Sequence, residues 1–397
     1  MSTPTGPLRG IKIIDLSTAI AAPFAVAMLA DQGADVIKVE SPGFGDIARY
    51  IGASRNGMGA MFQMSNRGKR GMALNLKEER GIEILKSLAE DADVVIHNFR
   101  VGVVERLGIS YADLSSNNPN LIYCSVYGYG HTGPYAHKRA YDNVIQCFSG
   151  VAHTQADVDT GEPVQNYQAI ADKLTSMNAA QAITAALFAR ERGHGGQHVR
   201  LSMVDSVIAF LWMDASGMAT FLEDGAIAGP QVAKGNKLIQ FRNGWGAAAP
   251  AADAEFFGLC RAFGVDANDP RVATAMDRMV NTDYVKELMQ QVWAAARNMD
   301  ADEALALMDA EDVPCAKVMA LEELPEHPQI KANNTFVESL HPVAGRIQQP
   351  RPAPEFEKTP AQAGAPAPTI GQHSDEILRE LGLSDQVAEL RDTKIIA

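Results

Sequence analysis

Cysteine is scarce in this chain, and the cysteines are too widely spaced to form a paired motif. Only four of the 397 residues are cysteines: Cys124, Cys147, Cys260 and Cys315. This wide separation, without a Cys-x-x-Cys motif, excludes a dense disulfide framework and is typical of reduced thiols in a cytoplasmic protein. His131, His137 and His153 lie near one another but lack the i, i+4 spacing of a helical zinc motif. We therefore expect a cytoplasmic protein that holds no metal.

Positive charge and long apolar runs are also in short supply. The 35 basic residues are outnumbered by 48 acidic ones, for a net charge of -13, which disfavours nucleic acid and acidic membrane surfaces as partners. The longest apolar run, residues 19–30, contains Pro23 and falls short of the roughly 20 residues that a membrane helix needs. The first ten residues lack the basic and apolar pattern of a signal peptide. We expect neither a nucleic acid nor a membrane as partner.

Hydrophobic residues, 46% of the chain, alternate between strand and helix periods. The pattern predicts strands at 11–16, 35–40, 72–76, 93–97, 121–126 and 197–202, and helices at 22–34, 79–88 and 203–221. Strands that alternate with helices in this way form a parallel sheet, so we predict a doubly wound, Rossmann-like α/β layer. The length of 397 residues exceeds the usual ceiling for one domain and predicts a second one.

The composition changes after about residue 223. A pair of short strands within 238–250 and helices as far as 309 indicate a smaller α+β domain. Six prolines between 350 and 368 then predict an extended arm of polyproline type, and a last amphipathic helix is expected at 374–383.

Asp172 lies where the loop 166–171 runs into a helix expected from Lys173 to about Arg192. A carboxylate at a helix start is expected to keep its charge and to lie beside free backbone N–H groups. Aspartate is a common N-cap, and Thr175 is placed to help satisfy the same turn, so capping alone accounts for the position. A nucleophilic carboxylate needs the same surroundings, because its attack on an acyl group creates an oxyanion. The spacing leaves both interpretations open.

The segment Gly128–Gly133 fits the pattern Gly-x-Gly-x-x-Gly, which often marks a dinucleotide site. Such a site needs a helix directly afterwards and an acidic residue about 20 positions on, whereas Pro134 and Tyr135 follow here. We interpret the segment as a tight loop. A serine hydrolase is also disfavoured, because the chain has no Gly-x-Ser-x-Gly motif.

Basic residues cluster around three of the expected strands. They are Arg67, Lys69, Arg70 and Lys77 with the amide of Asn66, then Arg100 and Arg106 after Asn98 and Phe99, then Lys138 and Arg139 before Tyr141. The loops at the carboxyl ends of parallel strands form the ligand crevice of such a fold, so these cations are placed to converge on phosphates, with Phe99 as an apolar wall. Ordinary solvated surface charge is the alternative.

Taken together, several ordered blocks resemble the family III CoA-transferases, a group that also includes 2-methylacyl-CoA racemase. The blocks are 8–17, 33–40, 66–70, 126–135, 190–193 and 370–378, so the resemblance covers essentially the whole chain. It implies an interlocked homodimer in which a large α/β domain is built from both termini. It also implies four parts: 1–205 in the CoA-binding domain, 206–225 as a linker helix, 226–325 as the small domain, and 326–397 as a Pro-rich return arm with the rest of the large domain.

By the same resemblance, Asp172 is the nucleophile that takes CoA from an acyl-CoA and passes it to a small carboxylic acid. The expected intermediates are a mixed anhydride and an aspartyl-CoA thioester, with coenzyme A as cosubstrate. The positions expected to bind CoA are Ile20, Ala21, Leu74, Asn75, Lys77, Asn98, Phe99, Arg100, Arg106, Lys138, Arg139 and Tyr141.

Departures from the family pattern separate the activities. Tyr141 stands where the racemases have a histidine, and tyrosine is a poor base at neutral pH, so transfer is favoured over racemisation with Asp172 as the base. A silent CoA-binding protein is disfavoured because the nucleophile is intact.

Other departures concern the acid substrate. Formyl-CoA transferases have a glutamine where this chain has Ile20, an arginine in place of Ser41 and a glycine run that is missing between residues 229 and 258. These differences disfavour oxalate-type specificity. Residues 243–246 are a candidate substitute lid, and Lys173 is a candidate for tuning the charge of Asp172.

Overall fold

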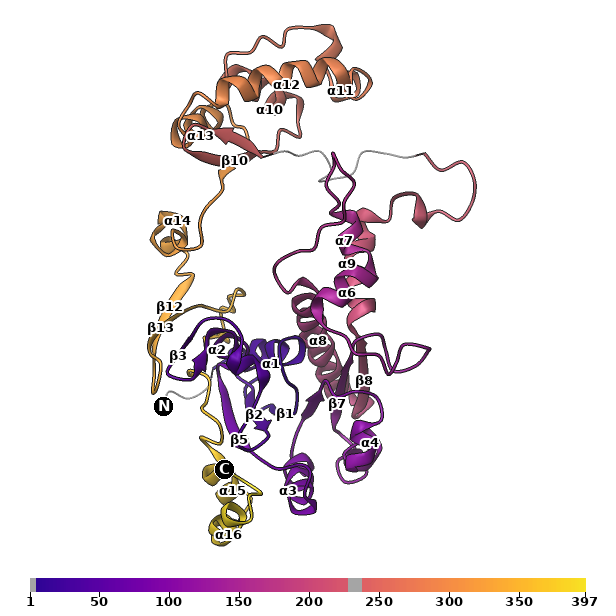
Figure 1. Cartoon of the computed structure of the whole chain (residues 1–397), viewed down its shortest axis with the longest axis vertical. Helices are drawn as coiled ribbons and strands as arrows, with labels where there is room; N and C mark the ends of the chain where they lie inside the picture. Colours follow the sequence, from indigo (N-terminus) through magenta and orange to yellow (C-terminus); the bar gives the residue numbers. More distant parts are fainter. Residues whose placement is uncertain (1–4, 228–237) are drawn as a thin grey trace. The chain divides into compact units, whose positions relative to one another are not determined.

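The computed structural model describes residues 5–227 and 238–397 (Figure 1). The described chain divides into two compact units, one of residues 1–216 with 332–397 and the other of residues 217–331. Residues 229–237, which begin the stretch searched for a glycine run, lie outside the described residues. Both ends of the described chain therefore belong to the first unit.

The first unit contains both helices and strands, which alternate along much of the chain. They are β1 (Lys12–Asp15), α1 (Ala21–Asp31), β2 (Asp35–Glu40), β3 (Ser54–Arg55), β4 (Met58–Gly59), α2 (Ala60–Asn66), β5 (Lys69–Ala73), α3 (Glu79–Glu90), β6 (Val94–His97), α4 (Val103–Leu107), α5 (Tyr111–Ser115), β7 (Ile122–Tyr127), α6 (Asp142–Ser149), α7 (Val151–Thr154), α8 (Ile170–Ala189), β8 (Gln197–Ser202), α9 (Met203–Ala215), β12 (Phe336–His341), β13 (Gly345–Pro350), α15 (Ser374–Glu380) and α16 (Val387–Asp392).

A six-stranded parallel sheet forms the centre of this unit, with the order β5-β2-β1-β6-β7-β8. Counted along the chain, these are its third, second, first, fourth, fifth and sixth strands. The order reverses between β1 and β6, where Ile13 pairs with Val36 on one side and Val94 on the other. The predicted α/β class with a parallel sheet is confirmed.

Apolar side chains cover both faces of the sheet, because successive residues of a strand point to opposite sides. Ile13 and Val94 face a core shared with α1, α8 and α9, whereas Ile14 and Val95 face one shared with α3, α5, α15 and α16. Helices α1 and α8 pack closely, through small residues such as Ala25 and Ala179 that are wholly buried (Figure 1). Because helices pack on both faces of the sheet, a ligand can approach it only at the loops that follow the strand ends.

Several expected elements differ from the structure in their bounds. The helix expected at 22–34 ends at Asp31, and the one expected at 374–383 ends at Glu380. The strand predicted at 72–76 is β5, at 69–73, because Lys69 and Arg70 lie within the strand. Asp35 of the adjacent strand β2 neutralises Arg70, and Asp15 of β1, one strand further, neutralises Lys69. The helix predicted at 203–221 ends at Ala215 and is followed by a short 3-10 turn at Gly217–Thr220. Strands β2 and β8 have the predicted bounds.

A β-hairpin that the sequence did not predict precedes the segment 350–368, which is expected to be extended. Strands β12 and β13 pair antiparallel from Phe336↔Pro350 to His341↔Gly345. Gly345 permits the turn because its φ of 76° is strained for other residues. The chain beyond the hairpin then lies against the first unit, where Ala367 N donates to Gln63 Oε1 at 3.0 Å and Pro368 O accepts from Arg49 at 3.0 Å.

The second unit is a small α+β layer. It contains β9 (Ile239–Phe241), β10 (Gly244–Ala248), α10 (Asp253–Ala262), α11 (Ala275–Val280), α12 (Thr282–Ala296), α13 (Ala301–Ala310), β11 (Cys315–Lys317) and α14 (Pro328–Ala332). The antiparallel sheet has the order β11-β10-β9, one strand more than predicted. Asn243 at the β9–β10 turn accepts from Ala301 N at 2.7 Å. This residue of the candidate lid is therefore bonded to the start of α13.

Across residues 5–227 and 238–397, no helix combines the length and apolarity that a membrane crossing requires. The four cysteines are free thiols, as their spacing predicts.

Gly81 in α3 gives a test of the packing beside the loop that follows β5. A Cβ at residue 81 would lie 2.0 Å from the carbonyl oxygen of Asn75, a backbone atom that cannot move aside alone. Although alanine favours a helix, we expect Gly81→Ala to lower the free energy of unfolding by about 1–3 kcal/mol in chemical denaturation. The exposed Ser87→Ala in the same helix is the control and should cause no loss; equal stability of both variants would contradict this packing.

Candidate functional site

The reversal of strand order places two loops side by side at the carboxyl ends of β1 and β6. In a doubly wound sheet this switch point is where ligands bind. A cavity of about 280 Å³ opens there. It is lined by Thr18, Ala19, Ile20, Ala21, Ile47, Asn98, Phe99, Arg100, Val126, Tyr127, Gly128, Ala136, Lys138, Arg139, Ala140, Tyr141, Asp172 and Met203. All of these residues belong to the first unit.

Most of the site residues predicted from the sequence line this one cavity. They are Asp172, Ile20, Ala21, Asn98, Phe99, Arg100, Lys138, Arg139 and Tyr141. Leu74, Asn75, Lys77 and Arg106 are not among the lining residues. Leu74 is buried and bridges to Ile396, so a ligand would reach the loop after β5 through Asn75 or Lys77.

Asp172 does not cap its helix. Helix α8 begins at Ile170 with Ala169 as the N-cap, so Asp172 is the third helical residue and the expected start at Lys173 is wrong. Its backbone N–H donates to Asp142 Oδ1 at 3.0 Å, and Thr175 donates its hydroxyl to Ala171 O instead of serving the first turn. The side chain is therefore free of the capping role and lines the cavity.

The helix start does not by itself set the ionisation of this carboxyl. Burial, followed by the nearby carboxylate of Asp142, raises the pKa of Asp172 from 3.8 to about 7. The helix N-terminus favours the anion by about 0.3–1 kcal/mol, which is too little to offset burial beside a second carboxylate. Lys173 is exposed and forms no ion pair within the described part of the chain. A carboxyl that titrates near neutral pH in a cleft is typical of a functional site.

Three cations line the same cavity. Arg100, Lys138 and Arg139 are exposed, and none of them forms a salt bridge with a residue in the described ranges. The ammonium of Lys138 lies 3.4 Å from the centre of the Tyr135 ring, which holds the charge without neutralising it. Unpaired cations of this kind are available for an anionic ligand.

Asn98 lines the cavity and also holds the loop that follows β1. Its Oδ1 accepts from Thr18 N at 2.9 Å and its Nδ2 donates to Thr18 O at 2.8 Å. Both ends of the amide are thus engaged with the loop after β1. Phe99 is half-buried and stacks on His97, so it lines the cavity as the expected apolar wall.

Sequence reasoning missed Asp142, whose carboxylate positions the backbone of Asp172 and raises its pKa. Its only sequence signal is its place directly after Tyr141, which stands where the racemases have a histidine. It also missed the packing reason for Gly128, where a Cβ would lie 2.3 Å from that of Ala140. As expected, no helix follows the glycine pattern directly, since the next one begins at Asp142.

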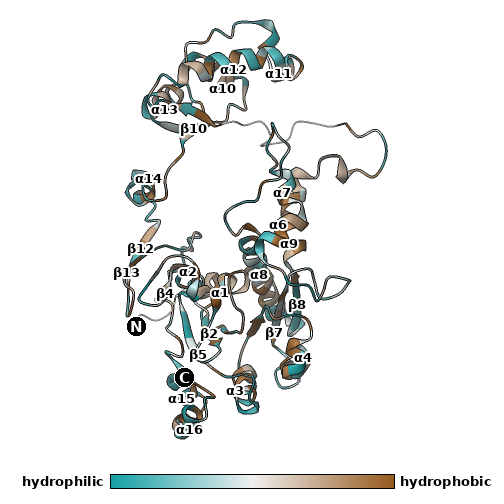
Figure 2. Ribbon diagram, viewed as in Figure 1, coloured by the Kyte–Doolittle hydropathy of each residue, from teal (hydrophilic) through white to brown (hydrophobic). Residues whose placement is uncertain are grey.

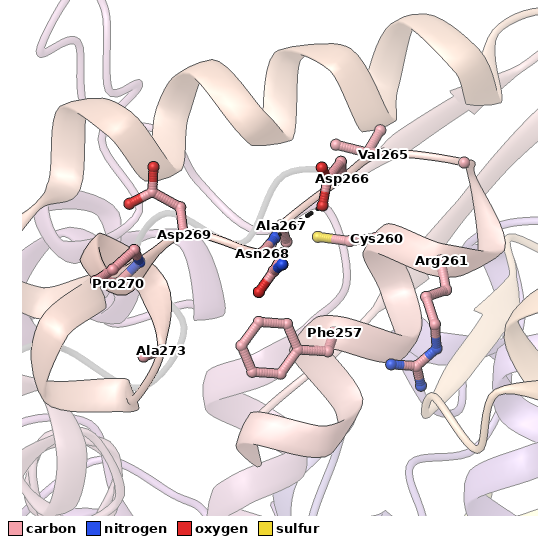
Figure 3. A pocket seen from close by; sticks show the side chains of 11 residues that line it. Phe257, Cys260, Arg261, Val265, Asp266, Ala267, Asn268, Asp269, Pro270 and Ala273 are labelled. Carbon is pink, nitrogen blue, oxygen red and sulfur yellow. Dashed lines mark hydrogen bonds between the residues drawn. The ribbon is translucent and has the colours of Figure 1, made fainter.

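The second unit has a larger hollow, of about 800 Å³, between α10 and the loop that follows it (Figure 3). Its charged side chains are already engaged, with Arg261 paired to Glu311 and Asp269 to Arg271. None of the predicted site residues lies there. Residues 5–227 and 238–397 also contain no group of three or more His, Cys, Asp or Glu side chains arranged to hold a metal ion.

A comparison with known families identifies the chain. The model of CoA-transferase family III matches residues 8–374. The chain belongs to this family. Among relatives, it is 32% identical to the succinate–glutarate CoA-transferase of Agrobacterium fabrum, with 96% of this chain and 97% of that protein covered. It is 30% identical to a formyl-CoA:oxalate CoA-transferase of Escherichia coli, with 100% of both chains covered.

Solved structures agree with the family III assignment. A crystal structure of a CAIB/BAIF family protein from Brucella suis matches with a TM-score of 0.82 and 30% identity, covering 95% of this chain and 100% of that one. This family III chain is thus an enzyme of the CoA-transferase class, with an acyl-CoA as its substrate.

The raised pKa of Asp172 predicts a pH-dependent effect on stability. The folded carboxyl binds its proton more tightly than the unfolded one, so its stabilising contribution is full below about pH 4 and is lost as pH rises through 7. We expect Asp172→Asn to raise the free energy of unfolding, with a gain up to about 4 kcal/mol larger at pH 8 than at pH 4. Chemical denaturation at both pH values measures this difference.

Asp205→Asn is the matched control, because Asp205 is the third residue of α9 and is exposed. Its effect should not grow with pH. A gain for Asp172→Asn that is equal at the two pH values would show that the carboxyl ionises normally.

Proposed function

We propose that this enzyme transfers CoA from an acyl-CoA to a small carboxylic acid, with Asp172 as the nucleophile. The observation that carries the proposal is geometric: one cavity is lined by the carboxyl of Asp172 and by three cations that form no salt bridge in the described part of the chain. Arg100, Lys138 and Arg139 supply charge for CoA phosphates and for the oxyanions of acyl transfer. Neither nucleic acid nor a membrane is needed as partner.

The first half of the reaction loads Asp172. Its carboxylate attacks the thioester carbonyl, the C–S bond breaks, and CoA leaves as the thiolate from a mixed anhydride. The thiolate then attacks the Asp172 carbonyl carbon, the donor acid leaves as its carboxylate, and an aspartyl-CoA thioester remains. The covalent intermediate conserves the energy of the thioester as long as water is excluded.

The second half repeats these steps in reverse order. The acceptor carboxylate attacks the aspartyl thioester and expels the CoA thiolate, which then attacks the acceptor carbonyl and releases Asp172 as a carboxylate. No proton is gained or lost overall, so the cycle needs no general base. This suits a pocket in which Tyr141 stands at the racemase position, is exposed and caps α6 only through its backbone.

Racemisation of a 2-methylacyl-CoA is the second candidate, since a carboxyl with a pKa of about 7 is a competent base. It needs a second acid/base group opposite Asp172. Tyr141 stands at the racemase position, and a tyrosine is a poor base at neutral pH, which makes it poorly suited to that role. Transfer therefore remains the better match.

The acid substrate we favour is a short dicarboxylate. Relatives at 31% and 32% identity are named for succinyl-CoA or succinate with glutarate. Three cations line the cavity, so positive charge is available for a second carboxylate of the acid as well as for the carboxylate that reacts. Ile20, in place of the polar residue of oxalate-specific members, removes a hydrogen-bond partner for a very small acid.

We also propose a homodimer, located in the cytoplasm, in which helices α8 and α9 are covered by the partner. Both helices expose large apolar residues, among them Phe188, Phe210, Trp212 and Met213, and the hydrophobic colour of α9 is plain in Figure 2. Several large apolar side chains exposed on two packed helices are typical of an interface. The parts 1–205, 206–225, 226–325 and 326–397 remain our proposed division of each chain.

The dimer has a direct test. We expect Phe210→Glu to convert the protein to a monomer in size-exclusion chromatography with light scattering, because a charge in an apolar interface is left without a partner. Exposed Lys286→Glu, in the second unit, is the charge-change control. A wild-type monomer, or a dimer of Phe210→Glu, would contradict this interface.

The nucleophile is tested by trapping it. The protein is incubated with succinyl-CoA and treated with hydroxylamine or borohydride, and the modified residue is mapped by mass spectrometry. We expect modification at Asp172, no modification in Asp172→Asn, and loss of turnover by at least about 10³-fold, because covalent relay has no substitute. Glutarate should discharge the intermediate faster than oxalate.

Asp205→Asn serves again as the control and should load normally. Full turnover in Asp172→Asn would rule out the proposed nucleophile. Exchange of the α-proton of a 2-methylacyl-CoA for deuterium, without any adduct, would favour the racemase instead.

A further inference from the structure

The segment Ser17–Pro23 supplies four consecutive lining residues, Thr18 to Ala21, to the cavity. Four buried charged side chains each hold one backbone group of this segment. Asp15 Oδ1 accepts from Ser17 N at 2.9 Å, Lys38 Nζ donates to Ser17 O, Asp46 Oδ1 accepts from Ala19 N at 2.9 Å, and Lys69 Nζ donates to Pro23 O at 2.8 Å. The contacts follow one another along the backbone toward the start of α1.

The four charges also neutralise one another. Lys69 lies 2.7 Å from Asp15, and Lys38 lies 3.0 Å from Asp46. Burial alone would raise the pKa of Asp15, but the charges of Lys38 and Lys69 outweigh it and hold that pKa below its usual range. Apolar residues of similar size are often at least as stabilising as a buried ion pair, so such a network calls for another reason. Here every member has a backbone partner beside the cavity.

Ala19 shows that the segment is held in a conformation it would not adopt alone. Its φ is 66°, in the left-handed region that disfavours a residue with a Cβ. The N–H group of this residue is the one that donates to Asp46. Strained backbone of this kind persists only where the surroundings enforce it, and it is common at functional sites.

A hydroxyl joins the segment to the nucleophile's own helix. Ser176 Oγ lies 2.6 Å from Ala21 O and 2.8 Å from Asp172 O, and Ser176 is wholly buried. The other side of the segment is held by Asn98 through Thr18. The backbone of residues 17–23 is thus fixed both to the sheet and to the turn of α8 that carries Asp172.

We propose that Asp15, Lys38, Asp46 and Lys69, together with Ser176, are positioning residues that fix the Thr18–Ala21 backbone against Asp172 for acyl transfer. The proposal rests on the function assigned to Asp172 above. These residues do not touch the reacting atoms. They hold the cavity-lining backbone of Thr18–Ala21. A displacement of this backbone by about 1 Å is enough to slow a reaction that depends on orientation.

Ala19→Gly separates positioning from stability. Glycine accepts the left-handed φ without strain, so the melting temperature should stay the same or rise by a few degrees. The freed segment should nevertheless lower the rate of adduct formation at Asp172 about tenfold at saturating succinyl-CoA. Asp312→Gly, at an exposed residue with a φ of 59°, is the matched control and should keep the wild-type rate.

Asp46→Asn tests the charge network itself. The amide keeps an oxygen for Ala19 N but leaves the charge of Lys38 poorly paired, so we expect a lower melting temperature and an adduct rate reduced at least tenfold. Asp31→Asn removes an equally buried pair with Arg67, 2.7 Å away, that touches no lining residue. Its melting temperature should fall similarly while the adduct rate stays within about twofold of wild type.

Hydrogen–deuterium exchange of residues 16–24 supplies a readout that needs no substrate. Exchange there should accelerate in Ala19→Gly, Asp46→Asn and Ser176→Ala, and stay unchanged in Asp31→Asn. Unchanged exchange, or an adduct rate that follows the melting temperature alone across all variants, overturns the proposal. Absence of any adduct in the wild-type protein would instead refute the function proposed for Asp172, and the exchange result would still decide whether the segment is held by these residues.

Discussion

The pairing of β1 with both β2 and β6 is the constraint on which the rest of the first unit depends. Because the strand order reverses at β1, the crossover helices leave opposite faces of the sheet, and a crevice opens between the ends of β1 and β6. The loops after these two strands can then meet, and Thr18 and Asn98 bond to each other there. The order of the strands therefore sets the position of the candidate site, and the side chains then determine its chemistry.

Opposing electrostatic demands meet at this site. Asp172 must be ionised to attack an acyl group, yet burial and Asp142 both favour its protonated form. The cations that would favour the anion, Arg100, Lys138 and Arg139, are exposed and screened by water. Closure over a bound acyl-CoA would remove that water and strengthen their attraction for the carboxylate, so the free enzyme need not hold a fully charged nucleophile.

Local sequence patterns predicted correctly those elements in which apolar residues are buried and charged residues are exposed. The apolar strands β2 and β8 have the expected bounds, and the basic loops after β6 and β7 do line one cavity. The pattern failed where partners distant in sequence change the character of a residue. Lys69 belongs to a cluster of basic residues, yet it is buried and neutralised by Asp15. The hairpin of Phe336–Pro350 depends on pairing between its two halves, which the pattern did not predict.

The sequence by itself determined the fold class, the crevice loops and the resemblance to CoA-transferases, because these depend on hydrophobic period and on ordered motifs. Only the tertiary structure decided the state of Asp172, since ionisation depends on burial and on Asp142, thirty residues away. It likewise decided that Asn98 holds a loop and that four buried charges converge on one backbone segment. Those contacts join strands and helices far apart in the chain, and no local spacing encodes the distance between them.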